Sequence, residues 1–348
     1  MKKNINYKNS KTIKIDDDYG EKMNICNADE LKKNNANECS TENNYGDNYS
    51  TASSDIQINK ENISLEELKS NVKNAKVYMD DIFQNLIEEE KIQMNNINSN
   101  YFNCQPEITP YMRSILIDWI IDINRQFKFK EETLYLTIYF IDAYLSKKYI
   151  EKRNFQLLGI SSLLISSKLN EVFLRKISDY SDITYNTYKV KDILNMEKDI
   201  LKTLNFDLLI PTPLSFYEII SQKLGISDDI NKFQFGEFLM QSFLINNISI
   251  NYSSSTIAYA VCYILAKFCK MENYRMIFDN NNLCNVKENI CNNNNIYSNE
   301  YVIKDCAKKI CETIAEIINS NINSTVNKYS DNIFFNNIKN NFRSNNTN

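Results

Sequence analysis

The chain has 348 residues and a formal net charge of −4, and 43% of its residues are hydrophobic, enough for a sizeable core. It contains no histidine, so mechanisms that use an imidazole as base, proton shuttle or metal ligand are excluded. Five glycines and four prolines are too few for a turn-rich β fold, and we therefore expect an all-α protein. The acidic balance argues against general binding of nucleic acid, because phosphate contacts need clustered Lys and Arg.

No apolar run reaches the roughly 18 residues of a membrane span, and the N-terminus lacks the apolar stretch of a secretory signal. We therefore expect a soluble intracellular protein, without metal or cofactor. None of the nine cysteines forms Cys-x-x-Cys, and Cys262 and Cys269 follow an apolar helical pattern typical of small core residues. A metal site remains an alternative, and it would use the irregularly spaced Cys284, Cys291, Cys306 and Cys311.

The first part of the chain is rich in Asn, Lys, Asp and Ser, and we predict a disordered tail over residues 1–74. Helical periodicity begins in a short leading helix, where Tyr78, Ile82 and Leu86 recur at i, i+4 and i+8. After the broken stretch NYFNCQPEITPY come further helical segments, and we assign residues 75–208 to an N-terminal domain with its leading helix.

One later segment, FQLLGISSLLISSKLNEVF, is apolar or small at nearly every position, which is typical of a helix buried on all sides. The same order of segments returns in weaker form in the second half, where TIAYAVCYILA takes the corresponding third place. We predict a C-terminal domain over residues 209–335, with an Asn-rich insert at 279–299, followed by a polar tail at 336–348.

The segment YMRSILIDWIIDINRQF holds the one tryptophan and is apolar around most of its circumference. At about 100° per residue, its apolar residues from Met112 to Phe127 spread over an arc of about 140°, with Ile117 and Ile121 outside that arc. A helix that is buried on one face needs an arc of about 100°. The surplus indicates either burial on two sides, or a core face together with an exposed apolar patch that binds a ligand.

The residues QPEITPYMRSILIDWIIDI resemble the start of the cyclin box in A- and B-type (mitotic) cyclins. The resemblance continues in order through LYLTIYFIDAYLSK, FQLLGISSLLISSKLNE, NMEKDILKTLNFDL and PTPLSFYEI, and then through SSSTIAYAVCYILAKF and VNKYSDNIFFNNI. It covers residues 75 to 335 apart from the Asn-rich insert. It implies two stacked five-helix cyclin-box domains, preceded by a short helix.

The resemblance also implies a function. Cyclins are not enzymes but regulatory subunits that bind and activate a cyclin-dependent serine/threonine kinase, here in cell-cycle control at G2/M. Lys168 in SSKLNE and Glu197 in NMEKD match charged kinase contacts of the family. The apolar kinase contacts match Ile82, Leu169, Val172, Phe173 and Leu208. The chain departs from the family at Asn170, where an acid is usual, and at Leu174 and Arg175, where prolines are usual, which leaves the identity of the kinase open.

In the family, the opening helix of the box forms a groove that docks Arg-x-Leu motifs of substrates and inhibitors. The matching residues here are Met112, Ile115, Leu116, Trp119 and Gln156. Lys152 stands at the position of a groove arginine, and Asp122 is one methylene shorter than the usual Glu. The resemblance therefore implies retained docking with an altered preference.

Lys60, Glu61 and Asn62 form a triplet that in the family recruits the ubiquitin ligase that destroys mitotic cyclins. This copy lies upstream of the expected fold, where a degron is accessible. We interpret the copy at residues 287–289 as a chance occurrence. The family's Arg-x-x-Leu degron is missing upstream, because no arginine precedes Arg113. We expect the protein in the nucleus and the cytoplasm.

Two alternatives share the resembled fold. A transcription-type cyclin would partner a polymerase-associated kinase, but the segments MRSILIDW and NMEKDIL favour the cell-cycle branch. A general transcription factor that binds promoter DNA would need a basic face and usually a zinc ribbon. The negative charge and the absence of Cys-x-x-Cys argue against that function.

Overall fold

The computed structural model describes residues 65–93, 96–271, 299–318, 320, 322 and 324–337, with the side chains of the first helix described from Tyr78 on. The chain divides into two units within α1 (Leu65–Gln93), and every described residue from Phe83 onward belongs to the second unit. The degron triplet at 60–62, the Asn-rich insert up to residue 298 and the chain after residue 337 lie outside the described residues.

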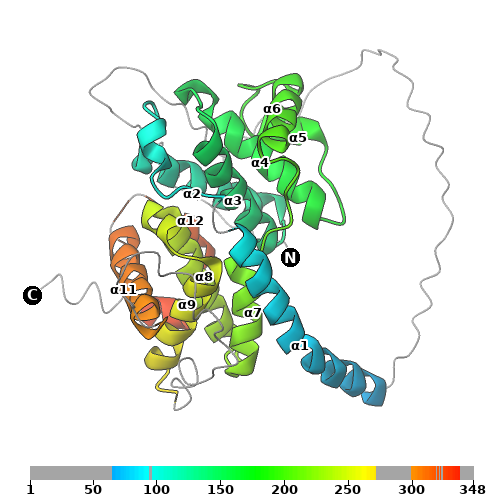
Figure 1. The fold of residues 1–348 in the computed structure, drawn as a ribbon, viewed down its shortest axis with the longest axis vertical. Helices are drawn as coiled ribbons and strands as arrows, with labels where there is room; N and C mark the ends of the chain where they lie inside the picture. The colour runs from blue at the N-terminus through cyan, green and yellow to red at the C-terminus, as the bar shows by residue number, and fades with distance from the viewer. Residues whose placement is uncertain are drawn as a thin grey trace, which may run out of the picture. The chain divides into compact units, whose positions relative to one another are not determined.

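All secondary structure in the described residues is helical, so the predicted fold class is confirmed (Figure 1). The N-terminal domain contains five α-helices and two 3₁₀ turns. These are η2 (Tyr101–Cys104), α2 (Pro110–Phe127), α3 (Glu131–Lys147), η3 (Lys152–Asn154), α4 (Phe155–Asn170), α5 (Ile177–Asp182) and α6 (Val190–Thr203).

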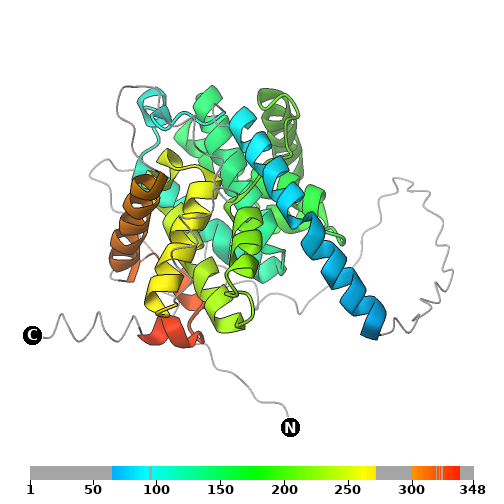
Figure 2. The ribbon, with the colours of Figure 1, turned by 60° about the horizontal axis from the view of Figure 1, so that its bottom comes forward.

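The C-terminal domain repeats this arrangement. In the described residues it comprises α7 (Pro213–Lys223), α8 (Ile230–Ile245), η4 (Asn247–Asn251), α9 (Ser254–Phe268), α11 (Asn299–Ile318) and α12 (Ser324–Lys328). The α9 helix packs between α7 and α11 (Figure 2). It is buried at nearly every position from Ser255 to Ala266, as its apolar and small residues predicted.

The leading helix is longer than predicted. α1 spans 29 residues from Leu65, so the prediction of a short leading helix and of disorder up to residue 74 is wrong for residues 65–74. No glycine or proline interrupts the sequence from 65 to 93, so nothing breaks the ladder of backbone hydrogen bonds.

The last turns of α1 pack on the C-terminal domain. The Phe83 ring meets Phe216 and Tyr259 edge to face, with ring centroids 5.7 and 6.3 Å apart. Glu90 accepts hydrogen bonds from the backbone N–H (2.8 Å) and the hydroxyl (2.5 Å) of Ser255, and so holds the start of α9. Burial raises the pKa of Glu90.

The α4 helix is the centre of the N-terminal domain, where it packs against α2, α3 and α6. Every residue from Phe155 to Ser167 is buried, which confirms the prediction of burial on all sides. Small residues permit the close packing. A Cβ atom added at Gly159 would lie 2.8 Å from Cδ1 of Leu116, and the Ser161 hydroxyl donates to the Ile193 carbonyl at 3.3 Å.

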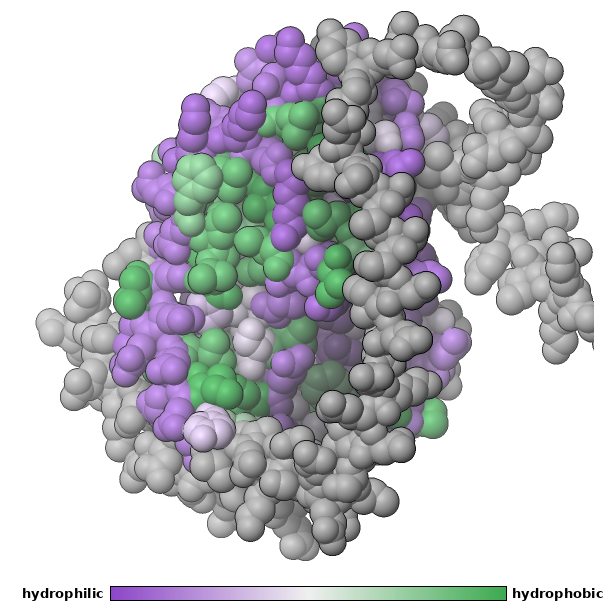
Figure 3. All heavy atoms as spheres, turned by 90° about the vertical axis from the view of Figure 1, so that its right-hand side faces the viewer, coloured by the Kyte–Doolittle hydropathy of each residue, from purple (hydrophilic) through white to green (hydrophobic). Residues whose placement is uncertain are grey.

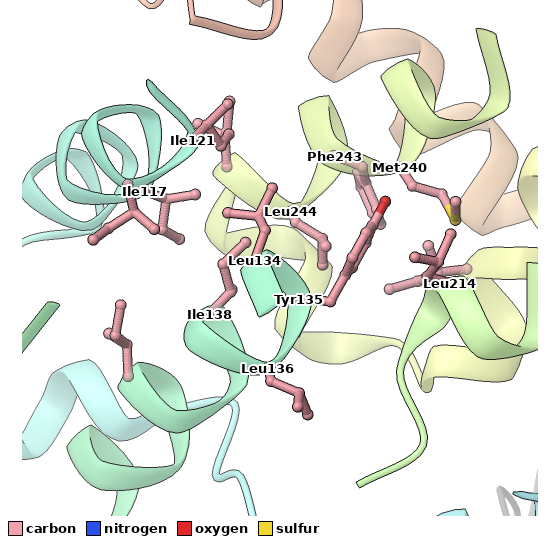
Figure 4. Packing of buried hydrophobic residues seen from close by; sticks show 14 of the residues in the cluster. Ile117, Ile121, Leu134, Tyr135, Leu136, Ile138, Leu214, Met240, Phe243 and Leu244 are labelled. Carbon is pink, nitrogen blue, oxygen red and sulfur yellow. The ribbon is translucent and has the colours of Figure 1, made fainter. Parts of the chain in front are cut away.

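The opening helix, α2, is buried on two sides. It begins at Pro110, where the side chain of Thr109 accepts a hydrogen bond from the Met112 N–H. It packs against α3 and α4 of its own domain and against α8 and α12 of the other. Figure 4 shows Ile117 and Ile121 beside apolar residues of α3, with residues of α7 and α8 beyond them. Ile117 and Ile121 are 0% and 1% exposed, so burial on two sides accounts for the surplus apolar surface of α2.

A buried ion pair lies at the interface between the two domains. Arg113 is completely buried and donates from Nε and Nη2 to the two carboxylate oxygens of Asp142, at 2.7 and 2.6 Å. Its Nη1 donates to the carbonyls of Leu244 and Ile245 at the end of α8, and Tyr101 donates to Asp142 at 2.9 Å. Burial alone would lower the pKa of Arg113, but the Asp142 carboxylate raises it overall. The sequence analysis did not identify this pair.

Candidate functional site

The first candidate site is an ion pair between the end of α4 and the middle of α6. Lys168 Nζ lies 2.5 Å from Glu197 Oε1, so the two charged residues expected at one surface do meet. The Glu197 side chain is 10% exposed and that of Lys168 is 39% exposed. The carboxylate thus lies beneath the surface, where water screens the pair less than it screens a fully exposed one.

Glu197 occupies a position that a stable core would give to an apolar residue. Ile193, Glu197 and Ile200 are the buried residues of α6, spaced as one stripe of a helix, and both isoleucines are 0% exposed. A carboxylate inside such a stripe needs a partner to offset its desolvation. Lys168 provides that partner. A charged residue within an apolar helical stripe is a pattern that the sequence itself displays.

Large exposed apolar side chains follow Lys168 in the chain. Leu169 is 42% exposed, Val172 77% and Phe173 89%, although all three are apolar. We call Lys168, Leu169, Val172, Phe173 and Glu197 the α4–α6 surface. The helices α4, α5 and α6 lie at the upper right in Figure 1, and the upper part of that side in Figure 3 carries apolar area bordered by polar atoms. An exposed apolar patch of this kind marks an interaction site.

The two remaining apolar contacts expected from the resemblance differ in exposure. Ile82 in α1 is 48% exposed, whereas Leu208 is half-buried and packs against the core. Leu208 can therefore offer a partner only part of its side chain.

The structure adds two exposed residues that the sequence analysis missed, Phe206 (67%) and Leu209 (79%). Phe206 and the preceding Asn205 both have left-handed backbone conformations, with φ of 59° and 52°. A bulky residue rarely adopts this conformation, and such strain concentrates at functional sites. The absence of glycine directly after α6, in LNFDL, is the sequence signal that could have identified the position.

The second candidate site is the outer edge of α2. Met112 is 6% exposed, and Ile115 and Trp119 are each 9% exposed, so these side chains reach the surface with only a small part of their area. The expectation that Leu116 lines the same surface is wrong, because Leu116 is 0% exposed. Its side chain packs against Gly159 of α4 instead.

Gln156, in the first turn of α4, is 4% exposed. Its Nε2 atom is buried and has no hydrogen-bond partner within the described part of the chain. A buried donor without a partner costs about 1–3 kcal/mol. This amide is therefore a donor available to an incoming carbonyl group. We call Met112, Ile115, Trp119 and Gln156 the α2 edge.

The charged residues expected beside the α2 edge have partners. The Asp122 carboxylate accepts from Arg125 Nη2 at 2.5 Å and from Gln126 Nε2 at 2.8 Å. The backbone N–H of Lys152 donates to Glu107 at 2.8 Å, and a hydrogen bond from Tyr149 lowers the pKa of Glu107. A ligand cation would have to share Asp122 with Arg125.

Two partly buried carboxylates lie in α3 and α8. Burial raises the pKa of Glu132 in α3 to about 7, and burial together with Glu131 raises that of Glu237 in α8 to about 7. Glu132 accepts hydrogen bonds from the Thr212 hydroxyl at 2.9 and 2.8 Å, which joins α3 to the start of α7. The Glu132 contacts are those of a structural bridge between domains.

In the described residues, no helix combines the length and apolarity needed to cross a membrane. Within the same residues, His, Cys, Asp and Glu side chains form no group of three or more that could hold a metal ion. Of the four cysteines in the alternative metal site, Cys284 and Cys291 lie outside the described residues. Of the other two, Cys306 is buried and Cys311 is exposed.

Both halves of the chain match a known family. Residues 81–209 match the family model described as "Cyclin, N-terminal domain", and residues 211–340 match "Cyclin, C-terminal domain". Among solved structures, a viral cyclin from herpesvirus saimiri is similar in fold, with a TM-score of 0.55 and 18% identity, covering 67% of this chain and 97% of that chain.

Similar curated proteins carry related names. The chain is 43% identical over 149 residues to "G2/mitotic-specific cyclin-B1" of Caenorhabditis elegans, covering 43% of this chain and 40% of that protein. It is 34% identical over 218 residues to "G2/mitotic-specific cyclin-B" of Hydra vulgaris, and the match covers 63% of this chain and 59% of that protein. It is 32% identical over 206 residues to "Cyclin-A2-1" of rice (Oryza sativa subsp. japonica), and the match covers 58% of this chain and 42% of that protein. The chain thus spans about half the length of the curated relatives it matches.

Proposed function

The chain belongs to the cyclin family, and on that premise we propose that it is a regulatory subunit that binds and activates a cyclin-dependent serine/threonine kinase at G2/M. Relatives named as G2/mitotic-specific cyclins occur in an animal, a plant and a yeast, which supports a mitotic rather than a transcription-type cyclin. The observation that carries the kinase proposal is the Lys168–Glu197 pair, together with the exposed apolar side chains that follow Lys168 in the chain.

The proposed action is a shift in the populations of two kinase conformations. A kinase without its activator disfavours the arrangement in which its catalytic Lys–Glu pair is formed and its activation segment is ordered. A rigid surface that binds the active arrangement better stabilises it by the difference in affinity. A shift from 1:99 to 99:1 needs about 5.5 kcal/mol. An interface of standard size with a few desolvated anchors provides that much.

The α4–α6 surface meets the requirements for such an interface. Its helices belong to a packed domain, since α4 is buried from Phe155 to Ser167, so the surface changes little when it binds. Its apolar side chains are exposed, and its one ion pair is already formed. No catalytic step on this chain is needed, which agrees with a regulatory subunit rather than an enzyme.

Replacing Lys168 and Glu197 tests the proposal. We expect the variant Lys168→Ala/Glu197→Ala to remain folded, because Lys168 is partly exposed and both partners of the pair are removed together. Its affinity for a purified cyclin-dependent kinase should fall by about 2–5 kcal/mol, because kinase groups that contact Lys168 and Glu197 would be left buried without their partners. Calorimetric titration measures the affinity, and phosphate transfer to a peptide measures activation.

The matched control is Glu300→Ala in α11, which removes an exposed Lys–Glu pair far along the chain from the α4–α6 surface. Glu300→Ala should bind the kinase as the wild type does. If the Lys168→Ala/Glu197→Ala variant binds and activates equally well, the surface is assigned incorrectly.

The α2 edge supports a second part of the proposal, the docking of Arg-x-Leu motifs in substrates or inhibitors. Small parts of Met112, Ile115 and Trp119 reach the surface there, and Gln156 Nε2 has no hydrogen-bond partner among the residues that the structure describes. The leucine of the motif would pack on the apolar residues of the α2 edge. A peptide carbonyl would accept a hydrogen bond from Gln156, and the arginine would pair with the Asp122 carboxylate.

We also propose that Lys60, Glu61 and Asn62, outside the described residues, recruit a ubiquitin ligase, and that the protein occupies nucleus and cytoplasm. The Lys60→Ala variant should persist through division while the wild-type protein is degraded. Immunoblots of synchronised cells measure this difference, and fluorescence microscopy of a tagged chain measures localisation. Equal turnover of the two proteins would exclude the degron.

A further inference from the structure

The segment between α4 and α5 presents three consecutive apolar side chains to solvent. Val172 is 77% exposed, Phe173 89% and Leu174 57%. We call these three residues the apolar prong. Exposure of three apolar side chains to water is unfavourable. Neighbouring contacts are therefore needed to hold this segment in its exposed conformation.

The first support is Glu171, directly before the prong. Its Oε1 atom accepts hydrogen bonds from the backbone N–H of Lys130 (2.8 Å) and the hydroxyl of Thr133 (2.6 Å). Lys130 is the N-cap residue of α3 and makes no cap bond with its own side chain, so Glu171 serves as the cap from another element. The Lys130 ammonium in turn donates to the Asn170 carbonyl at 3.0 Å, at the end of α4.

The second support is Arg175, directly after the prong. Its guanidinium carbon lies 5.1 Å from the centroid of the Phe127 ring, and its Nη2 donates to the Phe127 carbonyl at 3.2 Å. The contact combines a cation–π interaction with a favourable charge at the C-terminal end of α2. A lysine could not make both contacts in the same way, because it lacks the planar fork of donors.

Phe127 is itself held in place. Its ring packs edge to face against Phe129 and Tyr180, with centroids 5.3 and 5.5 Å apart. The buried Tyr180 of α5 shares a hydrogen bond of 2.7 Å with Ser167 of α4. Arg175 therefore connects the far end of the prong to the packed interior of the domain.

We infer that Glu171 and Arg175 are positioning residues that hold the apolar prong ready to enter an apolar recess on the cyclin-dependent kinase. The inference rests on the proposed function, because Val172 and Phe173 of the prong belong to the α4–α6 surface. Leu174 adds apolar area to this surface. A segment that is ordered before binding loses less conformational entropy in the complex than a mobile one.

A double-mutant cycle in the full chain tests the inference, with a purified cyclin-dependent kinase as the probe. Arg175→Ala should weaken binding about tenfold, and Phe173→Ala at least as much. The double variant should bind no more weakly than Phe173→Ala alone, because Arg175 acts through the prong. Arg175→Lys should fall between the wild type and Arg175→Ala, and Arg153→Ala, which changes another exposed arginine, should bind as the wild type does.

Hydrogen exchange of the free chain gives the independent readout. Amides of residues 171–176 should exchange faster in Arg175→Ala, while amides within α2 and α4 keep the protection of the wild type. Unchanged exchange in 171–176, or losses of affinity that simply add in the cycle, would overturn the positioning role.

The two proposals fail in different ways. If Lys168→Ala/Glu197→Ala loses binding while Arg175→Ala binds as the wild type does, this inference alone is overturned. If the wild-type chain binds no cyclin-dependent kinase, the proposed function fails and the inference fails with it.

Discussion

At the scale of single residues, the polar groups inside apolar surroundings carry the most functional information. Glu197 lies in the buried stripe of α6 and is balanced by Lys168. Gln156 is even more buried, and its Nε2 atom has no hydrogen-bond partner in the described residues. A paired buried charge contributes to a rigid surface. A buried donor without a partner lowers the free energy of unfolding and can donate to a bound ligand.

Gln156→Leu should therefore change stability and docking in opposite directions. Leucine has nearly the same volume without the unsatisfied donor, so the free energy of unfolding should stay equal or rise by up to about 1–3 kcal/mol. Affinity for a labelled Arg-x-Leu peptide should fall about tenfold, the equivalent of one hydrogen bond of about 1.4 kcal/mol. Urea denaturation and fluorescence anisotropy measure the two quantities.

Kinase binding provides the control for this variant and should not change, since Gln156 is not part of the α4–α6 surface. A peptide that binds Gln156→Leu as tightly as the wild type would remove Gln156 from the docking site. A loss of stability would mean that the amide has an internal partner.

At the scale of helices, two glycines set how closely neighbouring helices approach. A Cβ atom at Gly236 in α8 would lie 2.0 Å from the hydroxyl oxygen and 2.4 Å from Cζ of Tyr217 in α7. The Tyr217 side chain is fully buried and its hydroxyl donates to the Phe233 carbonyl at 3.0 Å, so moving the ring would break this bond. At Gly159 the closest atom would be the flexible end of Leu116, at 2.8 Å.

Gly236→Ala should destabilise the protein despite the better helix propensity of alanine. Overpacking lowers the free energy of unfolding by about 1–3 kcal/mol or more, whereas the higher helix propensity of alanine raises it by about 1 kcal/mol. The matched control Gly159→Ala should lose less, because a leucine methyl moves more easily than a tyrosine ring. Thermal unfolding followed by circular dichroism compares the two, and an equal or reversed order would contradict this account of the packing.

At the scale of the whole molecule, polar contacts hold the two cyclin boxes together. Arg113, paired with Asp142, donates to two carbonyls at the end of α8, and Glu132 accepts a hydrogen bond from Thr212 at the start of α7. Two carboxyl groups resist ionisation, because burial raises the pKa of Glu132 and of Glu237 to about 7.

The raised pKa values predict that stability falls as pH rises. Between the ordinary pKa of 4.5 and about 7, the folded chain keeps protons on Glu132 and Glu237 that the unfolded chain has lost. The free energy of unfolding should therefore decrease with pH across this window, by at most about 1.4 kcal/mol per pH unit for each group. Their stabilising contribution is complete below pH 4.5 and is lost above about 7.

Urea denaturation at several pH values measures this slope. The variant Glu132→Gln/Glu237→Gln should show a smaller decrease between pH 4.5 and 7, because glutamine does not titrate. Other groups titrate in both proteins, so the difference between the two slopes is the diagnostic quantity. Equal slopes would show that neither carboxyl holds its proton in the folded chain.

The sequence by itself determined the helical class, the order of helices, the two domains and the family. It also identified Lys168 and Glu197, though only through the resemblance. These features depend on helical periodicity, caps and motif order, which repeat over a few residues along the chain. The α1 helix begins earlier than the polar composition of residues 65–74 predicts, because no glycine or proline interrupts the chain there.

Only the tertiary structure decided which apolar residues are exposed and which polar groups meet. Lys168 and Glu197 are 29 positions apart, and Arg113 reaches a carbonyl 131 positions away. Leu116 is a core residue, because Gly159 in another helix leaves space for it. Arg175 supports the apolar prong, because Phe127 lies at the end of α2. Burial and pairing depend on neighbours that are distant in the chain, and no local pattern specifies them.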